Sequence, residues 1–182
     1  MTEVARLTLL SHGMTDAMAD GRFPADEPLN AIGRRQAEAM DGSAGVAQRR
    51  LCGPEQRTRQ TAKLLGLQAE SEPRLADLDC GRWRGEAPAD LPPGELEAWL
   101  GQPGAAPHGG ESITDLISRA SRWLESLTAN PVRTVAVTHP AVIRAAIVAA
   151  LDIDPASFWR IDVEPATRVV LYFRGGRWTL RL

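Results

Sequence analysis

The sequence has few of the features that would tie it to a membrane, a nucleic acid or an oxidising compartment. It has only two cysteines, Cys52 and Cys80, in no spacing typical of a metal site, so we expect buried free thiols and a cytoplasmic protein. The longest apolar run, residues 141–151, contains Arg144 and falls short of the ~20 residues of a membrane span. The net charge of −2 gives no general attraction to nucleic acid or to anionic lipid. Residues 1–6 lack the basic and apolar segments of a signal peptide.

The composition is that of an ordinary globular protein. Hydrophobic residues make up 43% of the 182 residues and charged residues 24%, which is enough for a substantial core. We find no internal repeat, low-complexity tract or linker, so residues 1–182 are expected to form a single domain. Residues 85–110 are rich in proline and glycine and are expected to form a small insert or lid.

Short apolar runs alternate with amphipathic segments along most of the chain. We expect strands at residues 6–10, 49–52, 132–138, 168–173 and 177–182, and an extended segment at 75–78. We expect helices at residues 30–40, 55–65, 95–100, 112–127 and 141–151. This alternation predicts an α/β fold, namely a three-layer α/β/α sandwich whose mostly parallel sheet ends in an antiparallel edge hairpin.

The chain has only three histidines, and two of them follow predicted strands. His12 comes after the apolar residues 7–10, and His139 comes after residues 135–138. The carboxyl ends of parallel strands meet at one edge of a sheet, where open α/β folds bind ligands, so we expect the two histidines to share one site. The third histidine, His108, stands among proline and glycine residues and is expected in an exposed loop.

Two further segments supply charged residues. Arg57 and Arg59 fall in the first turns of a predicted helix, where a positive charge is unfavourable unless an anion joins it. We assign the anion role to Arg57 and a solvated position to Arg59. Asp77 lies between Leu75 and Leu78; apolar surroundings would raise its pKa and make it a proton donor, whereas a capping role is the commoner alternative.

Several motifs in order along the chain resemble the histidine phosphatase superfamily, which includes the cofactor-dependent phosphoglycerate mutases. They are Ser11-His12-Gly13-Met14-Thr15, Gly21-Arg22-Phe23, residues 28–37, 54–62 and 110–112, and Thr138-His139-Pro140 with the four residues after it. Asp77 falls where the family usually has a glutamate.

The resemblance implies a phosphoglycerate mutase-like fold and a phosphohistidine mechanism without a metal or other cofactor. His12 would be the nucleophile, Asp77 the proton donor, and Arg57 and His139 the groups that stabilise negative charge on the phosphoryl oxygens.

The residues that would bind the substrate include departures from the family pattern. Ser11 replaces the arginine that grips the phosphate in the family, and Pro140 stands where a glycine is usual. By resemblance, Ser11, Gly13, Thr15, Arg22 and Pro140 are expected to contact the substrate. Arg22 or Arg59 is a candidate to replace the missing guanidinium.

These expectations lead to a phosphomonoesterase that hydrolyses a small phosphorylated metabolite and needs neither nucleic acid nor membrane as a partner. The change at Ser11 keeps an alternative open, a catalytically impaired relative that binds a phosphorylated ligand or a protein. A phosphoglycerate mutase is the third reading, which the short chain disfavours. The sequence does not indicate an oligomeric state.

Overall fold

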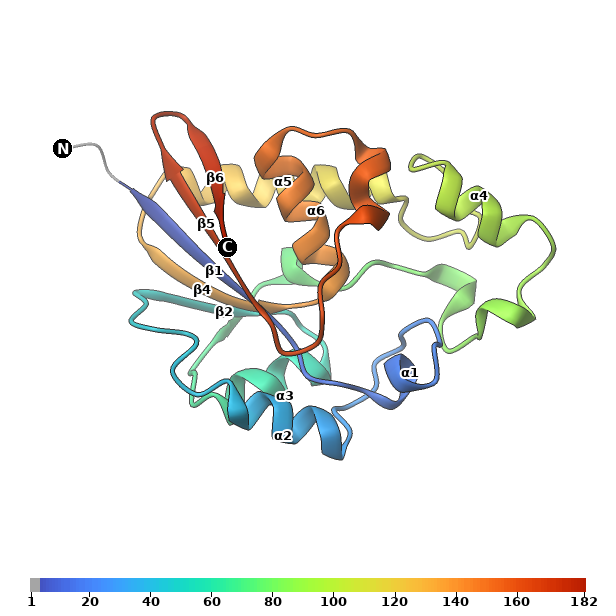
Figure 1. Ribbon diagram of the computed structural model, residues 1–182, viewed down its shortest axis with the longest axis horizontal. Helices are drawn as coiled ribbons and strands as arrows, with labels where there is room; N and C mark the ends of the chain where they lie inside the picture. Colours follow the sequence, from blue (N-terminus) through green and yellow to red (C-terminus); the bar gives the residue numbers. More distant parts are fainter. Residues whose placement is uncertain (1–3) are drawn as a thin grey trace.

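A six-stranded sheet forms the centre of the computed structural model, which describes residues 4–182 (Figure 1). The strands are β1 (Ala5–Ser11), β2 (Arg49–Cys52), β3 (Glu70–Ser71), β4 (Arg133–Thr138), β5 (Arg168–Arg174) and β6 (Arg177–Arg181), in the spatial order β3-β2-β4-β1-β5-β6. The strands β1 to β4 pair in parallel, and β5 and β6 add an antiparallel hairpin at one edge, as predicted. The signal-peptide prediction rests partly on Met1, Thr2 and Glu3, which lie outside the described residues.

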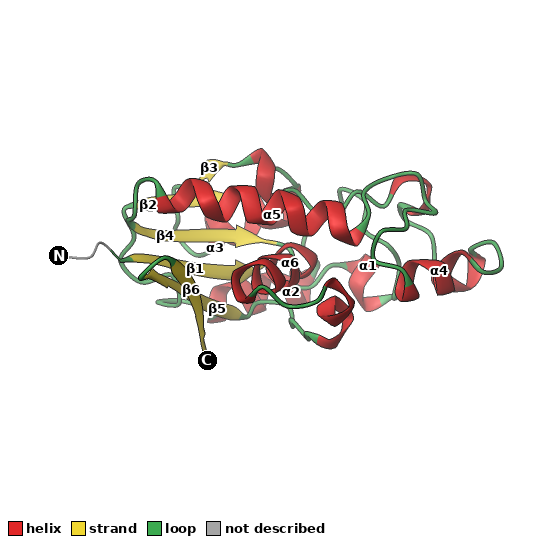
Figure 2. Cartoon of the chain, turned by 90° about the horizontal axis from the view of Figure 1, so that it is seen from above, coloured by secondary structure: helices red, strands yellow, loops and turns green. Residues whose placement is uncertain are grey.

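Helices cover both faces of the sheet. The helices α5 (Ile113–Thr128) and α6 (Pro140–Leu151) lie on one face, and α2 (Ala31–Ala39) and α3 (Gln56–Leu64) lie on the other (Figure 1). The short helices α1 (Asp16–Ala19) and α4 (Glu95–Gly101) lie beyond the carboxyl ends of β1 and β4 (Figure 2). The predicted three-layer sandwich is therefore confirmed.

The period of two along β1 divides the core between these layers. Leu7 and Leu9 belong to the cluster that packs under α5 and α6, whereas Leu10 belongs to the cluster under α2 and α3. The helix predicted at residues 112–127 is α5, and its apolar face is buried at Ile113, Leu116, Ala120, Trp123, Leu124 and Leu127. Both cysteines are buried and free, as predicted.

Some local expectations are wrong. Residues 75–78 are not a strand; a 3-10 helix (Pro73–Leu75) is followed by irregular chain. Ile32, an apolar residue of the predicted helix at residues 30–40, does not join the core and is 48% exposed. No helix within residues 4–182 is long and apolar enough to cross a membrane.

The Pro/Gly-rich segment is attached to the body of the protein through aromatic side chains. Trp99 on α4 is 1% exposed, and its ring lies 4.6 Å from that of His108 and 5.8 Å from that of Trp83. His108 is fully buried, contrary to the expectation of an exposed loop, because the two tryptophans enclose it. Its Nδ1 accepts a hydrogen bond from the Gly110 amide at 2.9 Å.

Candidate active site

Three parallel strands bring the predicted site residues to one edge of the sheet. Ser11 pairs with Thr138, and Cys52 pairs with Val137, so β1, β2 and β4 end together. The residues that follow β1 and β2 are bonded to the end of β4: the His12 amide donates to the Thr138 carbonyl at 3.0 Å, and the Gly53 amide donates to the Val137 carbonyl at 2.9 Å. The structure therefore brings His12 and His139 together, with ring centroids 5.1 Å apart.

His12 is held as a neutral imidazole with one ring nitrogen free. Its Nδ1 lies 2.7 Å from the Gly13 carbonyl oxygen. Because a carbonyl oxygen can only accept a hydrogen bond, Nδ1 carries the proton and Nε2 presents a lone pair. The side chain is 2% exposed. Burial lowers the pKa of His12 to about 3, and the positive charges of His139 and Arg57 act in the same direction.

Two glycines let the loop after His12 pack directly on a helix. A Cβ added at Gly13 would meet the Gly33 carbonyl oxygen of α2, and one added at Gly33 would meet the Met14 carbonyl oxygen at 2.0 Å. Real Cβ contacts are never this short, so both positions require glycine. The Gly13 amide donates to the Thr61 hydroxyl of α3 at 3.3 Å. The nucleophile loop is thus fixed between α2 and α3.

Arg57 supplies a buried guanidinium in the first turn of α3. It is 1% exposed, and its Nη2 lies 2.6 Å from Asp77 Oδ2. Its Nη1 donates to the Ala25 carbonyl at 2.7 Å and lies 3.9 Å from Glu27 Oε2. The predicted anion-binding arginine therefore has a carboxylate partner, Asp77.

Asp77 faces cations rather than apolar groups. Burial pushes the pKa of Asp77 upward, but the charges of His139 and Arg57 and the hydrogen bond from Arg57 outweigh burial and hold this pKa below its ordinary value. The expectation of a raised pKa is wrong, because Leu75 and Leu78 are buried in the core while the carboxylate turns to Arg57.

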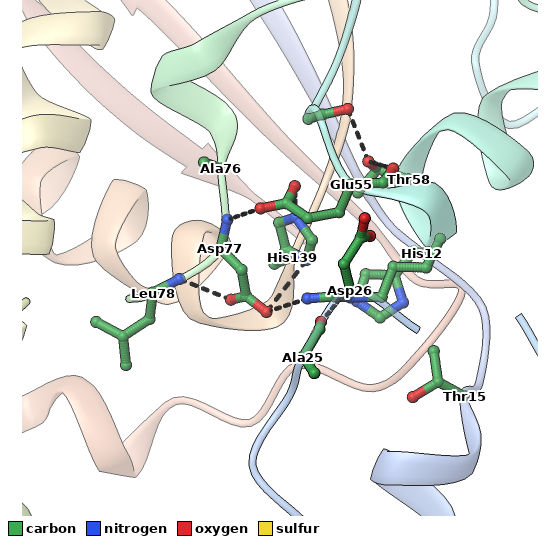
Figure 3. Close-up of polar contacts among 12 residues, drawn as sticks. His12, Thr15, Ala25, Asp26, Glu55, Thr58, Ala76, Asp77, Leu78 and His139 are labelled. Atoms are coloured by element: carbon green, nitrogen blue, oxygen red, sulfur yellow. Dashed lines mark hydrogen bonds and ion pairs between the residues drawn. The ribbon is translucent and has the colours of Figure 1, made fainter. Parts of the chain in front are cut away.

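His139 lies between two carboxylates (Figure 3). Its Nε2 is 2.8 Å from Glu55 Oε2, and its Nδ1 is 3.4 Å from Asp77 Oδ2. The residue is fully buried, and Nδ1 has no hydrogen-bond partner among residues 4–182. Glu55 was missed by sequence reasoning; the available signal was an acidic residue directly after the Gly53-Pro54 turn at the end of β2.

The structure does not place Ser11 at an anion site, which corrects our expectation. The Ser11 hydroxyl donates to the Glu164 carbonyl at 2.7 Å and accepts from the Thr167 amide at 2.8 Å. A serine is short enough to satisfy its hydroxyl with neighbouring backbone, so the side chain stabilises residues 164–167.

The other expected substrate contacts are also largely structural. Thr15 caps α1 by accepting from the Met18 amide at 3.2 Å and donates to Glu27 Oε1. Arg22 is exposed and donates to the Gly85 carbonyl at 3.2 Å, so it does not join the buried cluster. Arg59 is exposed too. Pro140 begins α6 directly after His139, where a missing amide proton is tolerated.

A cavity of about 350 Å³ opens beside the cluster. Its charged lining residues are Asp26, Glu55, Arg57, Asp77, Asp79 and Arg84. The paired side chains of Arg57 and Asp77 line it, and Asp77 in turn contacts His139. The ion pair therefore stands at the boundary between the cavity and the two buried histidines.

Comparison with known proteins identifies the family. The model of the histidine phosphatase superfamily (branch 1) matches residues 7–182, so the chain belongs to this superfamily. A glucosyl-3-phosphoglycerate phosphatase of Mycobacterium tuberculosis is 32% identical over 174 residues, which cover 85% of this chain and 78% of the relative.

Solved structures agree with this assignment. The mycobacterial glucosyl-3-phosphoglycerate phosphatase complexed with VO3 is 28% identical and covers 98% of each chain, with a TM-score of 0.88. A phosphoserine phosphatase from Entamoeba histolytica in complex with 3-phosphoglyceric acid is 22% identical, covers 97% of this chain and 94% of its own, has a TM-score of 0.87 and supports the fold alone.

Proposed function

We propose that this protein is a phosphomonoesterase that hydrolyses a small phosphorylated metabolite through a phosphohistidine on His12. The observation that carries the proposal is the state of His12, a buried neutral ring whose Nδ1 is bound to the Gly13 carbonyl and whose Nε2 is free. A neutral imidazole with a free lone pair is a nucleophile for phosphorus at any pH well above 3. The phosphatase relatives support the same reaction class.

The reaction has two transfers. In the first, His12 Nε2 forms a bond to phosphorus while the ester P–O bond breaks, and the departing alkoxide takes a proton from the Asp77 carboxyl group. In the second, water attacks the phosphohistidine, Asp77 takes the proton from that water, and the N–P bond breaks. Inorganic phosphate and neutral His12 are regenerated.

Arg57 links substrate binding to the protonation of Asp77. A phosphoryl group that pairs with the Arg57 guanidinium replaces Asp77 as the partner of Arg57. The negative charge of the phosphoryl group also offsets the positive charge of His139. The cationic influences that lower the pKa of Asp77 are then cancelled, and the opposing effect of burial remains. The carboxyl group thereby gains the proton that it must donate.

The proposal includes metal independence, because Arg57 and His139 supply the positive charge for the phosphoryl oxygens. It treats residues 1–182 as one cytoplasmic domain, with residues 85–110 as a wall near the substrate rather than a separate unit. The substrate partner is a small-molecule phosphomonoester.

One observation favours a second candidate, a binding protein without turnover. The Ser11 hydroxyl is bound to backbone, so the buried cluster contains one guanidinium, Arg57, and it is already paired with a carboxylate. Such a site offers less positive charge to a transition state than a site with two arginines.

Hydrolysis of p-nitrophenyl phosphate tests the proposal. We expect turnover that survives treatment with EDTA, an acid-labile phosphoenzyme after rapid quenching, and the loss of both in His12→Ala. A phosphoenzyme that persists in His12→Ala would contradict the mechanism. Absence of turnover combined with calorimetric binding of phosphate esters would favour the binding protein.

A further inference from the structure

Glu55 stands at the N-terminal cap of α3, but its side chain does not cap the helix. Glu55 is the N-cap residue of α3, with extended backbone angles of φ −75° and ψ 157°, yet its carboxylate makes no capping hydrogen bond. Asp26 caps the helix instead, because the Gln56 amide donates to Asp26 Oδ1 at 2.9 Å. The Glu55 carboxylate is thereby released from the helix end.

That carboxylate turns into the site and makes two hydrogen bonds there (Figure 3). Oε2 lies 2.8 Å from His139 Nε2, and Oε1 accepts from the Asp77 amide at 2.8 Å. A Cβ at position 53 would lie 3.1 Å from Glu55 Oε2 and 3.2 Å from His139 Nε2, so Gly53 leaves room for the contact. The Thr58 hydroxyl donates to the Glu55 carbonyl at 2.8 Å and so ties down its main chain.

The contact fixes where His139 carries its protons. A carboxylate oxygen can only accept, and each ring nitrogen of His139 faces one: Nε2 faces Glu55 and Nδ1 faces Asp77. Nε2 therefore has to donate to Glu55, and the carboxylate 3.4 Å from Nδ1 favours a proton there as well, although no hydrogen bond forms. Burial raises the pKa of Glu55, but the hydrogen bond and charge of His139 outweigh burial and lower it, so Glu55 is an acceptor near neutral pH. The Nδ1 proton has no hydrogen-bond partner in the buried cluster and is available to a phosphoryl oxygen.

We propose that Glu55 is a positioning residue that keeps His139 Nε2 protonated and thereby directs the Nδ1 proton of His139 at the phosphoryl group. It also holds the main chain of Asp77, so one carboxylate aligns both the charge donor and the proton donor. This inference rests on the proposed function. It accounts for how a site without an arginine at position 11 acquires a second cation beside Arg57.

Glu55→Gln is the direct test, because glutamine keeps the shape and removes the charge. An amide cannot accept from both His139 Nε2 and the Asp77 amide without turning its NH₂ group toward one of these donors. We expect kcat for p-nitrophenyl phosphate to fall roughly 10- to 100-fold, in the range seen when an oxyanion-hole type of donor is weakened, with a change in KM below about threefold.

Glu72→Gln is the matched control. Glu72 is a partly buried glutamate in the same stretch of chain as Asp77, but its carboxylate pairs with Arg74 and not with His139. It should keep the wild-type kcat. An equal loss of kcat in both variants, or none in Glu55→Gln, would overturn the assignment.

Ring ¹⁵N chemical shifts give a readout that does not depend on turnover or on the variant. The chain has three histidines, so the His139 signals are readily assigned by substitution. In the wild-type protein near neutral pH we expect protonated-type shifts at both His139 nitrogens, and in Glu55→Gln one unprotonated nitrogen. An unprotonated Nε2 in the wild-type protein refutes the role of Glu55 even if Glu55→Gln fails to fold. If both His139 nitrogens are protonated but the protein has no phosphatase activity, the role assigned to Glu55 stands and only the proposed function is refuted.

Discussion

Acidification should destabilise this protein through His12 in a way that can be isolated. The pKa of His12 falls from 6.5 to about 3 on folding, mainly because the ring is buried. At pH 7 His12 is mostly neutral in both the folded and the unfolded protein. At pH 5 the unfolded chain binds a proton that the folded protein still excludes, so the stability associated with neutral His12 is lost as the pH falls below the unfolded value.

The size of the loss in stability follows from the difference between the pH and the ordinary pKa of histidine. A shift of one unit corresponds to about 1.4 kcal/mol, and pH 5 lies roughly 1.5 units below the unfolded value, so His12 should remove about 2 kcal/mol between pH 7 and pH 5. The loss keeps growing as the pH falls further and levels off only below the folded-state pKa of about 3. A loss of this size is a large share of the net stability of a typical domain.

Urea denaturation of the wild-type protein and of His12→Asn at both pH values measures this contribution. Asparagine does not titrate, and its side-chain amide can donate to the Gly13 carbonyl as Nδ1 does. His108, whose pKa is also lowered by burial, contributes equally to both proteins and cancels in the comparison. The free energy of unfolding of His12→Asn should depend less on pH, by about 2 kcal/mol. Identical pH dependence in the two proteins would refute the burial of a neutral His12.

The remaining predictions concern the support of the site. Ser11→Ala should lower the free energy of unfolding by about 1 kcal/mol, because the Glu164 carbonyl and the Thr167 amide lose their partner; equal urea midpoints for variant and wild type would count against this. Gly33→Ala should destabilise the fold by about 1–3 kcal/mol and reduce turnover, because its Cβ would collide with the Met14 carbonyl beside the nucleophile loop. Gly104→Ala, whose Cβ meets no atom of the described residues within 4 Å, is the control and should behave as the wild type in both assays.

The site residues whose positions could be predicted from the sequence are those that directly follow strands of the sheet. His12 and His139 directly follow predicted parallel strands, and the carboxyl ends of neighbouring parallel strands meet whatever the loops do. The period-3.6 face of α5 was equally readable, because six of its apolar residues are buried. In both cases a local pattern implies a spatial arrangement directly.

The residues that were misplaced depend on contacts between distant segments. His108 has loop-like neighbours in sequence, but Trp83 and Trp99 bury it. Ser11 looked like a neighbour of the substrate, but its hydroxyl bonds to backbone more than 150 residues away. The pKa of Asp77 was expected from its apolar sequence neighbours, whereas Arg57 and His139 determine it. None of these partners is visible in the local sequence.

Position 11 and position 55 are best understood together. In the family pattern an arginine precedes the nucleophile, and here the serine at that place has turned away to hold residues 164–167. A carboxylate at position 55 beside two arginines would leave the phosphoryl group with less positive charge than the arginines supply. With Ser11, the same carboxylate stabilises the imidazolium of His139 and leaves its Nδ1 proton for the ligand. The site thus obtains its second cation from a histidine whose protonation depends on Glu55, and the rate of phosphoryl transfer should follow the state of that pair more than the residue at position 11.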